Sequence, residues 1–165
     1  MPRGLVNLDN VYQNNLGTFS KIIEVVLPVF YPEKFYNELF DAKDKSKQVF
    51  FSKMAYYGEI AVGALKAKLL PSKSGGVAAL GVYIEVLAVL DPYREKGIGS
   101  QLLQYIEDEC KEHFQHNIYV HVAANNEDSL KWYQKRGFEI EGEILKGYYK
   151  ETDGSTDAYV LKKHF

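Results

Sequence analysis

Residues 86–100 read Val86-Leu87-Ala88-Val89-Leu90-Asp91-Pro92-Tyr93-Arg94-Glu95-Lys96-Gly97-Ile98-Gly99-Ser100. The apolar run predicts a strand, Asp91-Pro92 ends it, and Arg-x-x-Gly-x-Gly opens the helix that follows. The first amides of a helix have no partner within it, and the helix dipole makes that end positive. Gly97 and Gly99 lack Cβ atoms, so a phosphate could approach the backbone there, and Arg94 could add two hydrogen bonds. The stretch therefore predicts a strand–loop–helix unit that binds a pyrophosphate.

Two other phosphate-binding loops are excluded by this sequence. A P-loop needs Gly-x-x-x-x-Gly-Lys-Ser/Thr, which does not occur in the chain. The Gly-x-Gly-x-x-Gly of a dinucleotide-binding fold is also missing, because Leu102 stands where its third glycine would be. A helix that simply begins with glycines is the other alternative. The preceding strand, the Asp-Pro-Tyr turn and Arg94 favour the phosphate site over it.

Outward from this unit, the hydrophobic pattern predicts helices and strands along the whole chain. Ile98, Leu102, Ile106 and Cys110 fall on one face of the helix that follows the glycines. Further helices are expected at residues 11–27, 32–40 and 127–136, the last of them capped by Asn126. Strands are expected at residues 48–57, 60–70, 81–90, 118–122, 137–149 and 158–162. We therefore expect an α+β fold, a single domain over residues 1–165 with a mixed, mostly antiparallel central sheet flanked by helices.

Composition limits the classes of function. The 165 residues are 46% hydrophobic and 25% charged, which is typical of one globular domain with its own core. Lys and Arg number 20 against 22 Asp and Glu, so direct nucleic-acid binding is not expected. The single cysteine, Cys110, excludes an internal disulfide, and no His or carboxylate spacing predicts a metal site. Because no apolar run could span a bilayer and the first residues lack a secretory signal, we expect a cytoplasmic protein without membrane contact.

A second motif follows the glycine loop by about 30 residues: Asn126-x-x-Ser129-x-x-x-Tyr133-x-x-x-Gly137-Phe138. Together with residues 94–99 it resembles the GNAT superfamily of acetyltransferases. The resemblance implies that acetyl-coenzyme A is the co-substrate, that Asn126 contacts its pantetheine arm, and that Tyr133 lies near its sulfur as general acid. The alternative for Tyr133 is a packed helix residue beside Trp132. The cofactor-binding residues that we expect are Leu87, Ala88, Val89, Arg94, Glu95, Lys96, Gly97, Ile98, Gly99, Ser100, Asn126 and Tyr133.

Other segments resemble the catalytic subunits of NatE-type N-terminal acetyltransferases, and residues 8–11 and 160–163 look most like the fungal ones. These segments are Leu8-Asp9-Asn10-Val11, Leu27-Pro28-Val29-Phe30-Tyr31, Lys34-Phe35-Tyr36, Tyr83-Ile84, Asn117-Ile118-Tyr119-Val120-His121-Val122, Tyr148-Tyr149-Lys150 and Val160-Leu161-Lys162-Lys163. The resemblance implies acetyl transfer to the α-amine of nascent polypeptides, with Met followed by an apolar residue preferred. It also implies a partner, the NatA complex at the ribosome. The chain departs from the family at Leu27, where a Phe is usual.

The same resemblance places Tyr83 and His121 at catalytic positions. Acyl transfer from a thioester needs an unprotonated amine, and an α-amine with a pKa of about 8 requires only a modest base. His121 is the candidate base, acting directly or through a water that Tyr83 helps to hold. A backbone amide around Leu87–Val89 would polarise the carbonyl. The alternative for His121 is a core histidine bonded to a carbonyl, and Cys110, on an apolar helix face, is not expected to form an acyl-enzyme.

For the acceptor peptide the resemblance implies a groove with two walls. The residues expected to bind it are Leu27, Pro28, Val29, Tyr31, Tyr83, Tyr148 and Tyr149. Aliphatic and aromatic walls suit an apolar first side chain, and tyrosine hydroxyls can bind a peptide backbone. Ordinary packing at a sheet edge is the alternative for the adjacent tyrosines.

Two other functions stay open at this point. One is a weakly active or inactive acetyl-CoA-binding subunit that positions or regulates NatA. The other is a GNAT enzyme that acetylates lysine side chains or small amines. Kinetics on Met-initiated peptides and on peptides with internal lysines would separate these alternatives from an N-terminal acetyltransferase.

Overall fold

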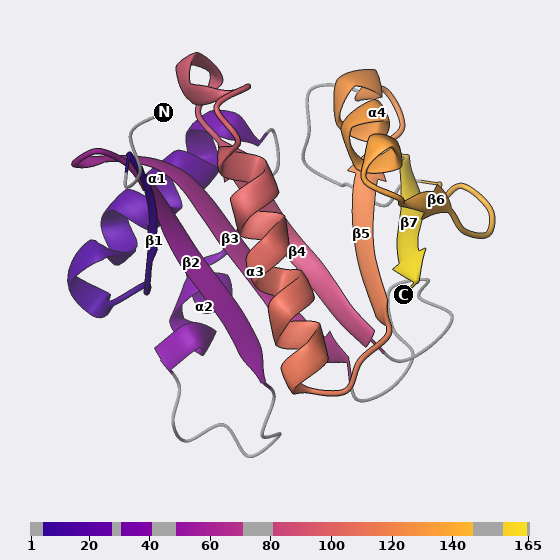
Figure 1. The fold of residues 1–165 in the computed structure, drawn as a ribbon, viewed down its shortest axis with the longest axis horizontal. Coiled ribbons are helices and arrows are strands. Elements are labelled where there is room, and N and C mark those ends of the chain that lie inside the picture. Colours follow the sequence, from indigo (N-terminus) through magenta and orange to yellow (C-terminus); the bar gives the residue numbers. More distant parts are fainter. Residues whose placement is uncertain (1–4, 28–30, 41–48, 71–80, 147–156, 165) are drawn as a thin grey trace.

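The computed structural model describes residues 5–27, 31–40, 49–70, 81–146 and 157–164 (Figure 1). The strands in this part of the chain form one seven-stranded sheet in the order β1-β2-β3-β4-β5-β7-β6. They are β1 (Val6–Asp9), β2 (Phe50–Tyr57), β3 (Ile60–Leu70), β4 (Gly81–Val89), β5 (Asn117–Ala123), β6 (Glu139–Ile140) and β7 (Ala158–His164). Neighbouring strands are antiparallel except β4 and β5, which are parallel. The predicted α+β fold with a mixed, mostly antiparallel sheet is therefore confirmed.

Helices cover both faces of this sheet (Figure 1). The α-helices are α1 (Leu16–Val26), α2 (Glu33–Asn37), α3 (Ile98–Glu112) and α4 (Glu127–Lys135), and the short 3-10 helices are η1 (Gln13–Asn15), η2 (Glu38–Phe40) and η3 (Asp91–Tyr93). The helices α1 and α2 share one apolar layer with the sheet, and α3 and α4 share the other. The sheet is thus sandwiched between two apolar layers, and its central strands β3 and β4 contribute buried apolar side chains to both.

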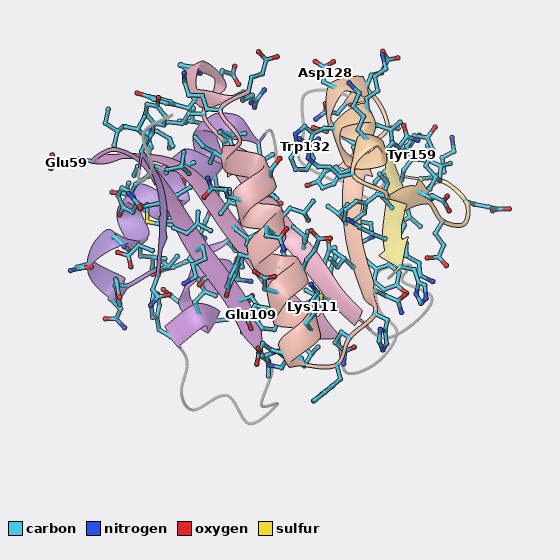
Figure 2. The ribbon with its side chains drawn as sticks, in the orientation of Figure 1. Glu59, Glu109, Lys111, Asp128, Trp132 and Tyr159 are labelled. Atoms are coloured by element: carbon cyan, nitrogen blue, oxygen red, sulfur yellow. The ribbon has the colours of Figure 1, made fainter. Side chains whose placement is uncertain are left out.

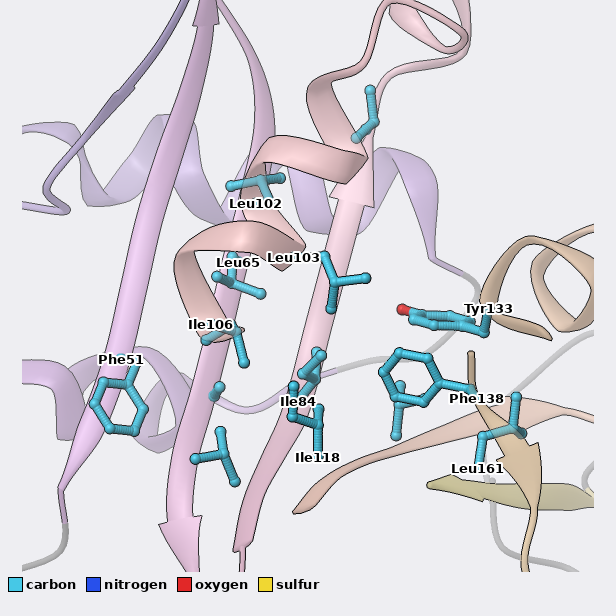
Figure 3. Close-up of a cluster of buried hydrophobic side chains, with 14 of the residues drawn as sticks. Phe51, Leu65, Ile84, Leu102, Leu103, Ile106, Ile118, Tyr133, Phe138 and Leu161 are labelled. Atoms are coloured by element: carbon cyan, nitrogen blue, oxygen red, sulfur yellow. The ribbon is translucent and has the colours of Figure 1, made fainter. Parts of the chain in front are cut away.

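The helix predicted from the glycine motif forms the centre of one layer. Ile98, Leu102, Ile106 and Cys110 are all buried, which confirms the helical spacing. Figure 3 shows Leu102 and Ile106 of α3 packed over the sheet. Each such side chain contributes about 1.5–3 kcal/mol by burial, so this face fixes α3 firmly on the sheet.

Two expected elements have other bounds than predicted, and one strand was not expected. The strand β1 was not expected, because four residues are too few for a clear alternation. The helix expected from residue 11 begins with η1 and becomes α-helical at Leu16. The strand expected at 137–149 is reduced to Glu139–Ile140 and a bridge between Leu145 and Ala158, because Gly142 (φ +73°) turns the chain between them. Residues 147–149 lie outside the described part.

Two irregularities in β4 shape the region where the candidate active site lies. Parallel pairing with β5 is restricted to Val82, Tyr83 and Ile84, although β4 continues to Val89 and β5 to Ala123. Beyond that point the two strands separate (Figure 1). Opposite Lys66 and Ala67 of β3, β4 contains one extra residue, Glu85, between Ile84 and Val86. This bulge changes the alternation: Ile84 belongs to the layer of α3, whereas Val86 and Ala88 belong to the layer of α1.

Candidate active site

The start of α3 has the properties expected of a phosphate site. Gly97 is its N-cap, with φ +80° in the left-handed region that favours glycine, and an added Cβ would meet nothing within 4 Å. The first turn carries no acidic residue and no side-chain cap. Among the described residues no acceptor binds the amides of residues 98–100, since the first helical bond runs from Gln101 N to Gly97 O at 3.0 Å. Free amides at the positive end of a helix fit a pyrophosphate.

Gly99 also has a packing role that the sequence did not predict. A Cβ on this residue would lie 2.9 Å from Cζ2 of Trp132, which is too close for two carbon atoms. Figure 2 shows Trp132 of α4 between its own helix and α3. The missing Cβ therefore makes room for the indole ring, and Gly99 brings α4 close to the start of α3. The expected phosphate contact of the Gly99 backbone stays a prediction beside this packing role.

Arg94 is engaged within its own turn. Its Nε donates to Val89 O at 3.1 Å, and its Nη2 pairs with Asp91 Oδ1 at 2.9 Å. The side chain thus closes the turn between β4 and α3, and the structure does not place it as the phosphate fork that the sequence suggested.

Arg136, at the end of α4, is the cation that sequence reasoning missed. Its Nε and Nη2 donate to Ser100 Oγ at 3.3 and 3.0 Å, and its Nη1 donates to Trp132 O at 3.0 Å. The guanidinium carbon lies 3.8 Å from the centroid of the Trp132 ring. Burial lowers the pKa of Arg136, and Tyr133 opposes that effect. A cation at the positive end of a helix is unfavourable by itself, and a bound phosphate would reverse that.

Asn126 and Tyr133 both occupy defined positions on α4. Asn126 Oδ1 accepts a hydrogen bond from Ser129 N at 3.1 Å, which confirms the predicted cap. Tyr133 is buried, with its ring at right angles to Trp132 and close to Phe138. Figure 3 shows its hydroxyl directed away from α4, toward α3 and β4. The ring of Tyr133 is therefore packed, as the alternative to a catalytic role predicts. Its hydroxyl, however, points toward β4, the strand that carries Leu87.

Leu87, Ala88 and Val89 lie on the part of β4 that has separated from β5. On the other side they pair with Leu65, Ala64 and Gly63 of β3. From Glu85 onward, the edge of β4 that faces β5 has no strand partner among the described residues. Backbone groups on such an edge are available to a ligand, as the predicted role of this segment requires.

Tyr83 and His121, predicted as catalytic partners, are in direct contact. His121 Nδ1 lies 2.7 Å from the Tyr83 hydroxyl oxygen, and the two rings meet edge to face at 4.9 Å. His121 is 9% exposed, so the pair lies at the boundary between core and surface. The hydroxyl can donate to Nδ1, or Nδ1–H can donate to the hydroxyl oxygen and leave Nε2 as a base. The structure thus brings together two residues that are 38 positions apart in the sequence.

On the acceptor side, the structure describes two of the predicted wall residues. Tyr31 stacks on Phe35 of α2 with 4.3 Å between ring centroids. Leu27 follows the last residue of α1, and both it and Tyr31 pack against the layer of α1. Four further predicted residues lie outside the described part: Pro28, Val29, Tyr148 and Tyr149.

The described residues offer neither a reactive cysteine nor a metal centre. Cys110 is buried, and burial raises the pKa of its thiol to about 12, which excludes a thiolate nucleophile near neutral pH. Over the described ranges, no three His, Cys, Asp or Glu side chains are grouped to hold a metal ion. In the same ranges no helix is both long and apolar enough to cross a membrane.

Comparison with known proteins agrees with this geometry. Residues 15–138 match the model of the Acetyltransferase (GNAT) family. The chain is 35% identical over 162 residues to N-alpha-acetyltransferase 50 of Danio rerio, covering 98% of this chain and 89% of that protein. It is 40% identical to a solved structure of Arabidopsis thaliana Naa50 in complex with the bisubstrate analogue CoA-Ac-MVNAL, with a TM-score of 0.79 over 98% of this chain and 99% of that one. The chain therefore belongs to the acetyltransferase (GNAT) family.

Proposed function

We propose that this protein transfers the acetyl group of acetyl-CoA to the N-terminal α-amine of polypeptides. The observation that carries the proposal is the Tyr83–His121 hydrogen bond beside the open edge of β4. A base within hydrogen-bond reach of a tyrosyl hydroxyl, next to available backbone amides, is what direct aminolysis of a thioester needs. Similarity to N-alpha-acetyltransferase 50 and to a structure that contains an N-terminal peptide analogue supports this choice of acceptor.

The cofactor residues divide into three groups. The amides of residues 98–100 bind the pyrophosphate, and Arg136 adds a positive charge beside that of Arg94. Asn126 keeps its side-chain oxygen for the helix cap, so its amide nitrogen is the group left to donate to the pantetheine arm. Bound acetyl-CoA would supply an activated acyl carbon, and an amide of the Leu87–Val89 edge hydrogen-bonds the carbonyl oxygen.

Proton transfer is assigned to three side chains. His121 accepts a proton from the α-ammonium or the attacking amine, directly or through a water that the Tyr83 hydroxyl holds. The amine nitrogen forms a bond to the acyl carbon, and the bond from that carbon to sulfur breaks. Tyr133 donates a proton to the departing sulfur. Attack is direct in this proposal, and Cys110, whose pKa burial raises to about 12, does not serve as an acyl-enzyme nucleophile.

We also propose a preferred peptide, a partner and a compartment for this protein. The analogue in the Arabidopsis structure begins Met-Val, which supports a preference for Met followed by an apolar residue. Apolar and aromatic side chains at Leu27 and Tyr31 suit such a residue. The NatA complex at the ribosome is the proposed partner and the cytoplasm the proposed compartment, on the strength of the family resemblance. Co-purification of the tagged chain with NatA subunits would test this partner.

The deciding experiment is acetyl transfer from acetyl-CoA to a Met-Leu-initiated peptide, measured by mass gain for the wild type and for His121→Ala. Activity that is lost in the variant supports both the reaction and the base. A peptide with a blocked α-amine and an internal lysine is the control, and preferential acetylation of it would contradict the proposal. Acetyl-CoA binding without any turnover would instead favour a non-catalytic subunit.

A further inference from the structure

Lys66 of β3 is fully buried although it carries a charged amine. Its Nζ donates to Glu85 Oε1 at 2.9 Å and also to Glu38 Oε1. The same Nζ lies 3.9 and 4.6 Å from the ring centroids of Phe35 and Phe50. Removing an ammonium from water costs several kcal/mol, and apolar side chains of similar size often stabilise a core equally well. Stability alone therefore does not explain this cluster.

The partners of Lys66 come from elements that flank the proposed acceptor groove. Glu85 is the extra residue of the β4 bulge, two positions after Tyr83, and its side chain is only 11% exposed. Glu38 belongs to η2 and Phe35 to α2, which form the segment that follows Tyr31. Phe35 in turn stacks on Tyr31. Lys66 thus connects the edge of β4 with the wall that contains Tyr31.

The charges on this face extend to the catalytic pair. Lys68, two residues along β3, places its Nζ 5.8 Å from the centroid of the Tyr83 ring. Burial raises the pKa of Glu85, while Lys66 and Lys68 lower it and Glu38 raises it again. The bulge carboxylate therefore contacts Lys66 and is also influenced by the charge of Lys68, two positions from the strand residue that contacts His121.

We propose that Lys66 is a positioning residue that sets the distance between the β4 bulge and the acceptor wall. By holding Glu85 and Glu38 together, it fixes Phe35 and hence Tyr31 against the groove. Its loss should weaken peptide binding and leave acetyl-CoA binding unchanged, because α3 and α4 lie on the other face of the sheet. This inference rests on the proposed function, since the wall is defined by the acceptor peptide.

The test uses the double variant Lys66→Met/Glu85→Met, which removes the ion pair and keeps the core apolar and filled. The matched control is Lys163→Met/Glu107→Met, which removes a 2.7 Å ion pair on the face of α3. We expect the peptide KM to rise about tenfold in the first variant, with the acetyl-CoA KM unchanged and both constants unchanged in the control. A peptide KM that does not change, or an equal rise in both constants, overturns the proposal.

A second readout does not depend on turnover. Amide hydrogen exchange of residues 33–40 should become about tenfold faster in the double variant, with α3 unaffected. If the wild type acetylates no peptide, the proposed function fails and exchange alone decides whether Lys66 holds this segment: unchanged exchange then overturns the inference. Should the double variant not fold, Glu38→Gln replaces it. Glu38 is partly exposed, and its replacement by Gln removes one charge while it keeps the shape of the side chain. We expect the same rise in peptide KM and in exchange of residues 33–40, and unchanged values of both overturn the proposal.

Discussion

The two sides of this active site are built in different ways. On the cofactor side, residues 94–100 form one continuous loop and helix start, and Asn126 and Tyr133 belong to a single short helix. On the acceptor side, Tyr31, Lys66, Tyr83 and His121 come from four separate segments. Free helix amides are a local property of the backbone, whereas a hydrogen bond between Tyr83 and His121 depends on the register of two parallel strands. Local motifs therefore point to the glycine loop on the cofactor side, whereas the roles of Asn126 and Tyr133 and the whole acceptor side are implied by a family resemblance.

The largest effect is expected from Gly97→Glu, which should affect only the cofactor side. A carboxylate at the start of α3 would occupy the phosphate position, so the Kd of acetyl-CoA should rise at least about 100-fold. Gly142→Glu is the matched control, because Gly142 also has a positive φ and open space around its Cα. Calorimetric titration measures both, and an equal loss in the two variants would mean that backbone strain, not phosphate repulsion, is responsible.

The next effect concerns the catalytic pair. His121→Ala should lower kcat about 100-fold by removing the base, with the Kd of acetyl-CoA unchanged. Tyr83→Phe should cost less, because the imidazole stays and only the hydroxyl is lost. His113→Ala is the control, since His113 lies at the end of α3 and bonds to Glu109 O. Steady-state kinetics and ligand titration measure these effects. If the affinity of His121→Ala for acetyl-CoA fell by the same factor as kcat, the assignment of His121 to catalysis alone would be contradicted.

Arg136→Met tests the cation that joins α4 to α3. We expect the acetyl-CoA KM to rise about tenfold and its dependence on salt to become weaker, because one phosphate partner is lost. Lys135→Met removes the same charge from an exposed neighbour and serves as control. A similar rise in the acetyl-CoA KM of both variants would indicate that only the overall positive charge of the surface matters, and not a contact made by Arg136.

The smallest effect is expected at Asn126, where two roles can be separated. Asn126→Ala removes the cap of α4 and should lower the free energy of unfolding by about 1 kcal/mol. Asn126→Ser keeps a capping oxygen and loses the amide donor, so stability should be retained while acetyl-CoA affinity falls a few-fold. Thermal unfolding and ligand titration measure the two quantities, and unchanged affinity in Asn126→Ser would remove Asn126 from the cofactor site.

Prediction of the fold from sequence was correct where the residues that determine a helix lie within that helix. The face of α3 and the cap of α4 were both predicted correctly, because each depends on residues within a few positions of one another. The strand expected at 137–149 was wrong, because an apolar run does not show that Gly142 turns the chain. The packing role of Gly99 was not predicted, since the ring that fills the space of its missing Cβ belongs to another helix.

The sequence by itself determined the class of fold, the buried face of α3 and the cap of α4, because periodicity, caps and glycines act over a few positions. Only the tertiary structure decided that β4 separates from β5 after Ile84, that Arg136 reaches the start of α3, and that Lys66 connects a strand bulge with η2. These features join residues that are dozens of positions apart. Their geometry is set by strand register and by packing between layers, which no local pattern in a single sequence encodes.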